Sequence, residues 1–189
     1  MESVHPAALI AALIGVTLWH ELGHIVAARM VRTPIRRISF GLGPVIWRRP
    51  LHRETDLLLR ALPLGMSIAV PARRTDGHAR PRHHDAWMAA GGPLASFLLT
   101  GLLFALARWG GLGPDWGFAL VGVGLLSAVV ALLNLVPLPG LDGGHLLALG
   151  LSRSGLRGCE NLERRMTKLA HYGVTVALLA PLILVFWRA

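Results

Sequence analysis

The sequence has little charge for its length. Only 15% of its 189 residues are Asp, Glu, Lys or Arg, whereas ordinary soluble domains carry about 25%. Hydrophobic residues make up 53% of the chain, and its mean hydropathy is +0.55. This composition argues against a soluble protein and predicts an integral membrane protein, with residues 1–189 forming a single domain.

Cysteine and N-terminal basic residues are also scarce. The single Cys159 excludes an intramolecular disulfide and a Cys-x-x-Cys metal site. Residues 1–5 contain no Lys or Arg, so we do not expect a cleavable signal peptide, which has a basic N-terminal region. A net charge of +9 is compatible with nucleic-acid binding. The arginines, however, are not interleaved with the aromatic residues that would stack on bases. We therefore expect a lipid bilayer as the surroundings and no nucleic-acid partner.

Long apolar stretches are what the sequence does have. A membrane helix needs about 20 predominantly apolar residues. The four candidate spans cover residues 6–31, 86–107, 116–139 and 169–187. The first reaches spanning length only by including polar residues at 20–24. We expect a mostly α-helical, polytopic membrane protein with about four transmembrane helices.

Basic residues are distributed unevenly between these stretches. Twelve arginines lie from Arg29 to Arg82, and five basic residues lie from Arg153 to Lys168. Because basic loops remain in the cytoplasm, we expect a cytoplasmic β-rich loop at 32–85 and an interfacial segment at 146–168. Both termini would then lie outside, and the expected location is a prokaryotic plasma membrane.

The residues at 20–24, His-Glu-Leu-Gly-His, form the strongest motif. Two histidines four residues apart lie about 6 Å apart along a helix axis and share a face. They can hold one metal ion beside a glutamate that acts as a base. Such polar groups are costly in an apolar stretch unless they are paired or functional. The motif predicts zinc ligands at His20 and His24 and a catalytic base at Glu21.

A third ligand is expected where the third apolar stretch breaks. Pro137 and Pro139 lack the N–H group of a regular helix, so the chain should unwind before Asp142. The predicted topology places Asp142 on the cytoplasmic side, at the depth of the two histidines. Catalytic zinc usually has three protein ligands, and Asp142 is the expected third. His145 is the alternative ligand, or a group that contacts a ligand or the substrate.

Between the first two apolar stretches lie four short β-favouring runs, at 35–40, 44–48, 56–61 and 64–70. A solvated loop is the alternative interpretation. An edge strand at 64–70 could pair with an extended substrate. The candidate substrate contacts are Gly65, Met66, Pro137 and Pro139.

Two further groups of residues have predicted roles. Asn134 is the candidate hydrogen-bond donor to an oxyanion or a group that orients substrate; the alternative is an ordinary contact between helices. Gly91, Gly92 and Ala95 are small enough for another helix to approach closely, and we interpret them as a packing surface for the histidine-bearing helix.

In order and spacing, these motifs resemble those of the site-2 proteases, a family of intramembrane zinc metalloproteases. The matching segments are HELGH at 20–24, FGLGP at 40–44, LPLGMSI at 62–68, AGGPLASFLL at 90–99 and NLVPLPGLDGGH at 134–145. The resemblance implies one Zn²⁺ per chain on His20, His24 and Asp142, with Glu21 as the base. It also implies a membrane-associated β-hairpin before the second span.

The chain departs from the common family pattern at several positions. Met66-Ser67 stand where many members have Gly-Tyr, and Ser96 stands where many have Asn. From the length of 189 residues we expect no PDZ-like or CBS-like domain.

The function predicted from these observations is hydrolysis of peptide bonds in or near transmembrane segments. The substrate would be a single-span membrane protein or a peptide, attacked by zinc-activated water with Glu21 moving the proton. The alternative is a non-proteolytic metal-binding or regulatory membrane protein of the same fold. A glutamate between the histidines favours the enzyme, because metal binding alone does not require it.

Overall fold

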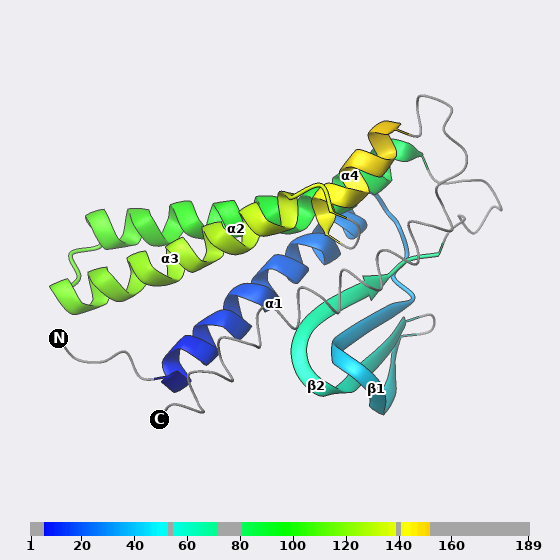
Figure 1. The fold of residues 1–189 in the computed structure, drawn as a ribbon, viewed down its shortest axis with the longest axis horizontal. Helices are drawn as coiled ribbons and strands as arrows, with labels where there is room; N and C mark the ends of the chain where they lie inside the picture. The colour runs from blue at the N-terminus through cyan, green and yellow to red at the C-terminus, as the bar shows by residue number, and fades with distance from the viewer. Residues whose placement is uncertain (1–5, 53–54, 72–80, 139–140, 152–189) are drawn as a thin grey trace. The chain divides into compact units, whose positions relative to one another are not determined.

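The computed structural model describes residues 6–52, 55–71, 81–138 and 141–151. The elements follow in the order α1 (Pro6–Met30), β1 (Arg37–His52), β2 (Thr55–Ala69), α2 (Arg82–Trp109), α3 (Pro114–Leu135) and α4 (Asp142–Leu151) (Figure 1). The chain divides into two compact units, residues 1–134 and residues 135–189. The predicted span at 169–187 and the interfacial segment after residue 151 lie outside the described residues.

Within the described residues, α1, α2 and α3 are long and apolar enough to cross a membrane. Large apolar side chains on these helices are exposed, for example Leu98 and Phe118, as expected where lipid covers them. The buried positions are mostly small, including Ala27, Ala28 and Ala131. These helices and the sheet between α1 and α2 confirm the predicted fold class.

Two of the helix boundaries that differ from the predicted spans lie beside proline. α2 begins at Arg82, so residues 82–85 are helical rather than part of the loop. Pro81 precedes it with extended backbone, φ −60° and ψ 134°, which is a suitable residue for starting a helix. α3 ends at Leu135 rather than 139, because Pro137 disfavours helical backbone at the residue before it. The predicted unwinding before Asp142 is confirmed.

Strands β1 and β2 form one sheet with a shifting register. Residues 37–40 of β1 have partners in both halves of β2, at 56–59 and at 66–69. Residues 45–52 of β1 pair with the first half of β2. Each long strand therefore bends back across the sheet (Figure 1), and segment 66–69 is an edge among the described residues. The four predicted β runs correspond to parts of these two strands.

The bend in β1 occurs where the sequence predicts an interruption. Gly41 and Gly43 have φ angles of +88° and +86°, a region that glycine enters without steric cost. Arg60 of β2 holds the bend: its Nε donates to Ser39 Oγ at 2.7 Å, and its Nη1 donates to the Gly43 carbonyl at 2.6 Å. The glycines therefore turn the strand without ending it.

Helix α1 packs against α2 and β2. At the crossing of α1 and α2, a Cβ added to Gly23 would collide with the Gly91 backbone and with Ala95 Cβ. A Cβ added to Gly91 would collide with the Gly23 carbonyl and with Ala27 Cβ. This contact confirms the predicted small-residue packing surface on α2.

Candidate metal centre

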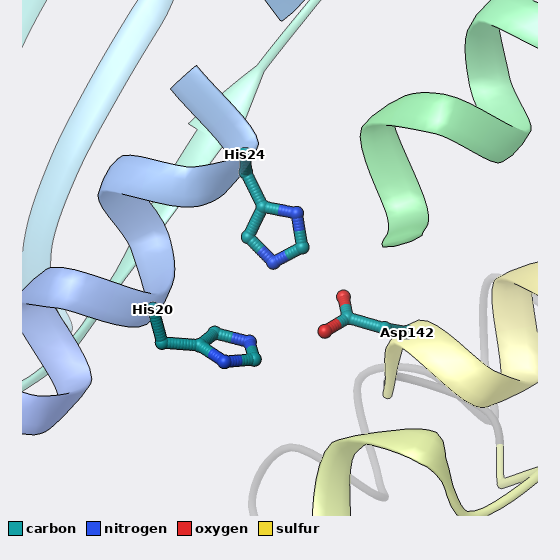
Figure 2. A group of neighbouring side chains, drawn as sticks. All are labelled: His20, His24 and Asp142. Atoms are coloured by element: carbon teal, nitrogen blue, oxygen red, sulfur yellow. The ribbon is translucent and has the colours of Figure 1, made fainter. Parts of the chain in front are cut away.

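His20 and His24 lie on one face of α1, one turn apart (Figure 2). They are 3% and 8% exposed, and their ring centroids lie 5.1 Å apart. Each ring offers a nitrogen within 4.8 Å of a nitrogen of the other. The i, i+4 spacing therefore produces the pair of converging imidazoles that the sequence predicts.

Helix α2 provides a hydrogen-bond partner for the Nδ1 atom of each ring. His24 Nδ1 lies 2.6 Å from the Met88 carbonyl oxygen, and His20 Nδ1 lies 3.0 Å from Ser96 Oγ. A carbonyl oxygen can only accept, so His24 Nδ1 donates and its Nε2 atom carries the lone pair. Metal-binding histidines are typically oriented in this way through the ring nitrogen that does not bind the metal.

The two Nε2 atoms converge over Gly92 of α2. A Cβ built on Gly92 would collide with Nε2 of both His20 and His24. Glycine is thus required at a position where two potential metal ligands meet. The sequence suggests only helix packing for Gly92, and the structure gives it this more specific role. Because Gly92 has no side chain, the space beside the two donor nitrogens can fit a metal ion.

Glu21 follows His20 on α1 and is half-buried. Asp142 is the first residue of α4, in the second compact unit, and it is also half-buried; Figure 2 draws its carboxylate. Gly143 allows α4 to begin close to the end of α3, because a Cβ there would collide with the carbonyls of Leu135 and Val136. His145 lies one turn later in α4 and is exposed.

The candidate substrate and oxyanion groups have different surroundings. Asn134 Nδ2 donates to the Val130 carbonyl at 2.9 Å, within its own helix. Pro137 is exposed in the segment between α3 and α4. Gly65 and Met66 belong to β2, with Met66 opposite Phe40. Pro139 lies outside the described residues. The roles of these residues stay predictions.

Sequence reasoning missed two contacts of the histidines. Ser96 is identifiable from the sequence only as a departure from the usual family residue, and its contact with His20 depends on how α1 and α2 cross. The Met88 contact uses a backbone carbonyl, which no side-chain pattern can indicate.

Parts of the chain are similar in sequence to known proteins. Residues 8–111 match peptidase family M50. A candidate zinc metalloprotease of Nostoc sp. is 42% identical over 74 residues, which cover 39% of this chain and 20% of that protein. The regulator of sigma-E protease RseP of Escherichia coli is 31% identical over 108 residues, covering 50% and 23%. The chain thus spans under a quarter of the length of either relative.

A solved structure has the same fold. The site-2 protease from Methanocaldococcus jannaschii aligns with 100% of this chain and 72% of its own, with a TM-score of 0.56 and 22% sequence identity. The match to the family covers more than half of the sequence, and helices α1 to α3 are apolar enough to cross a membrane. The chain is a multi-pass membrane protein that belongs to peptidase family M50, the site-2 protease family.

Proposed function

We propose that the protein is an intramembrane zinc metalloprotease that hydrolyses peptide bonds in or near transmembrane segments. The observation that carries the proposal is the buried pair His20 and His24 on an apolar helix, with Nδ1 partners on α2 and Nε2 atoms converging over Gly92. Ordinary core histidines do not require a glycine to leave space between their ring nitrogens. Relatives named as proteases support the same chemistry.

The proposed cofactor is one Zn²⁺ per chain. Two imidazole nitrogens and one carboxylate form a typical catalytic zinc set, which leaves a position open for water. We assign the carboxylate to Asp142, because α4 begins with this half-buried residue directly after the break in α3. His145 is exposed and remains the alternative third ligand.

The remaining chemistry is assigned to groups near these ligands. Zinc, when bound, supplies an activated water and polarises the scissile carbonyl. Glu21 accepts the proton of that water and passes it to the leaving amine. Asn134 donates one amide hydrogen to the Val130 carbonyl, and we assign its second amide hydrogen to the developing oxyanion.

The proposed substrate is a single-span membrane protein or a peptide in the bilayer. Its helix must open before a peptide bond can be cleaved, and unpaired backbone groups are costly in lipid. Segment 66–69 of β2 has partners on one side among the described residues, so strand addition there would replace part of the lost hydrogen bonding. Gly65 and Met66 in β2, and Pro137 and Pro139 after α3, are the proposed substrate contacts.

The proposed orientation follows from the arginines of the β1–β2 region. Retention of this basic region in the cytoplasm would place the metal centre toward the cytoplasmic side of a prokaryotic plasma membrane. The N-terminus, and after a fourth span the C-terminus, would lie outside.

The deciding experiment is co-expression of the chain with candidate single-span membrane proteins, comparing wild type with Glu21→Gln. Both proteins should contain zinc, but only wild type should release a cleavage product. Undiminished cleavage by the variant would refute the assignment of the base. A zinc-loaded wild type that cleaves no candidate, across a panel that a known family protease does cleave, would instead favour the non-proteolytic metal-binding alternative.

A further inference from the structure

We propose that Ser96 is a positioning residue of the metal centre, whose hydroxyl holds the His20 ring so that Nε2 faces the metal. This inference rests on the proposed function, since it assumes that His20 binds zinc. Ser96 lies on α2, and its hydroxyl oxygen is 3.0 Å from Nδ1 of His20. The two residues are 76 positions apart in the sequence, so this contact exists only in the folded helix pair.

The burial of this contact makes the hydroxyl hard to replace. Ser96 is 0% exposed and His20 is 3% exposed. Bulk water therefore does not reach the serine side chain. If the hydroxyl is removed, His20 Nδ1 loses a partner in a buried environment, where an unsatisfied polar group is costly.

Two further hydroxyl groups donate to the backbone carbonyl of Ser96, not to its side chain. Ser127 Oγ of α3 donates to the Ser96 carbonyl at 2.9 Å, and Thr100 Oγ1 of α2 donates to the same oxygen at 2.9 Å. Thr100 Oγ1 also lies 3.1 Å from the Gly124 carbonyl of α3. These bonds join α2 to α3 through the Ser96 backbone, which the substitution Ser96→Ala keeps, and neither hydroxyl bonds to a histidine.

The two histidines are held by different kinds of partner. His24 Nδ1 faces the Met88 carbonyl, which only accepts and which no side-chain substitution removes. The Ser96 hydroxyl can donate or accept, so by itself it is compatible with both neutral tautomers of His20. When the metal binds at Nε2, His20 Nδ1 carries the proton and donates it to Ser96 Oγ. Ser96 is therefore the orienting group that mutation can delete.

Ser96→Ala tests the role, with Ser127→Ala as the matched control. Both serines are 0% exposed, and both variants lose one hydroxyl, but only Ser96 contacts His20. Zinc affinity is measured on the purified full chain by competition with a chromogenic chelator. We expect Ser96→Ala to bind zinc about 10- to 100-fold more weakly, the usual loss for removal of a group that orients a metal ligand. Ser127→Ala should stay within about 3-fold of wild type, well below that range.

The absorption spectrum of the Co²⁺-substituted protein gives a second readout, because it reports ligand geometry rather than fold. Ser96→Ala should shift its visible bands, and Ser127→Ala should not. Alanine is smaller than serine and a better helix former, so we expect the variant to fold, which circular dichroism checks. Unchanged zinc affinity and Co²⁺ bands in Ser96→Ala would overturn the proposal, as would equal losses in both variants.

His20→Ala separates this inference from the proposed function. If His20→Ala retains full zinc affinity, the metal centre itself is wrongly assigned. If His20→Ala loses zinc while Ser96→Ala retains it, only the role of Ser96 fails.

Discussion

Replacement of Gly92 by alanine should remove zinc binding while leaving most of the fold intact. The added Cβ would lie within 3.0 Å of Nε2 of both His20 and His24, closer than real Cβ contacts. The flexible part of this contact is the pair of rings, so the rings should turn away and lose their convergence. Overpacking of this kind costs about 1–3 kcal/mol in stability.

The loss of zinc affinity should be larger than the loss caused by deleting an orienting partner. Loss of such a partner weakens metal binding by about 10- to 100-fold, whereas Gly92→Ala displaces both proposed ligands directly. We therefore expect a loss of more than about 100-fold, equivalent to roughly 2.7 kcal/mol or more. Zinc content and chelator competition on the purified protein measure it.

Gly91→Ala is the control, because a Cβ at this neighbouring glycine would contact the α1 backbone and Ala27 rather than a histidine. A Cβ on Gly91 would collide with the Gly23 carbonyl and Ala27 Cβ, so it should separate α1 from α2 and lower the melting temperature. Gly91→Ala should weaken zinc binding only through longer Nδ1 contacts, whereas Gly92→Ala should lose more zinc affinity and lower the melting temperature of the zinc-free protein less. Wild-type zinc affinity in Gly92→Ala, or the same pattern in both variants, would refute this interpretation.

Three other outcomes are expected. Glu21→Gln should retain zinc and lose cleavage by about 100-fold or more, measured by product release from a membrane substrate; a loss of zinc would contradict the role as base. Asp142→Ala should weaken zinc binding by at least about 10-fold, whereas His145→Ala should not; the reverse pattern would make His145 the third ligand. Finally, Arg49→Cys in a Cys159→Ser background should react with a membrane-impermeant thiol reagent only from the cytoplasmic side, and labelling from outside would invert the proposed topology.

The parts of this fold that the sequence predicts depend on local signals. The i, i+4 spacing predicts that His20 and His24 lie on one face of a helix, and in the structure they lie on one face of α1. Pro137 marks the end of α3 through its missing N–H and its effect on Val136. The β runs carry their own strand preference, but Gly41 and Gly43 are ambiguous, since a positive φ can end a strand or bend it. The hydrogen bonds from Arg60 to Ser39 and Gly43 hold the strand in a bend. These contacts join residues that are distant in the sequence, so local signals do not predict them.

The contacts that orient the histidines depend on how closely two helices cross. Lipid provides no hydrophobic drive between membrane helices, so close approach requires small residues at the crossing. Gly23 lies inside the HELGH motif, yet its own contact is with Gly91 and Ala95 of α2. That contact brings the Met88 carbonyl and the Ser96 hydroxyl within reach of the histidines on either side of Gly23.

Gly23 therefore links helix packing to metal chemistry. Successive residues of a helix point about 100° apart, so Gly91 and Gly92 meet different parts of α1. Gly91 allows the backbones to touch, and Gly92 leaves space where the Nε2 atoms converge. A larger residue at position 23 would push α2 outward and lengthen both Nδ1 hydrogen bonds at once. The glycine of the motif is thus as much a requirement of the proposed zinc site as the histidines, although it offers no ligand atom.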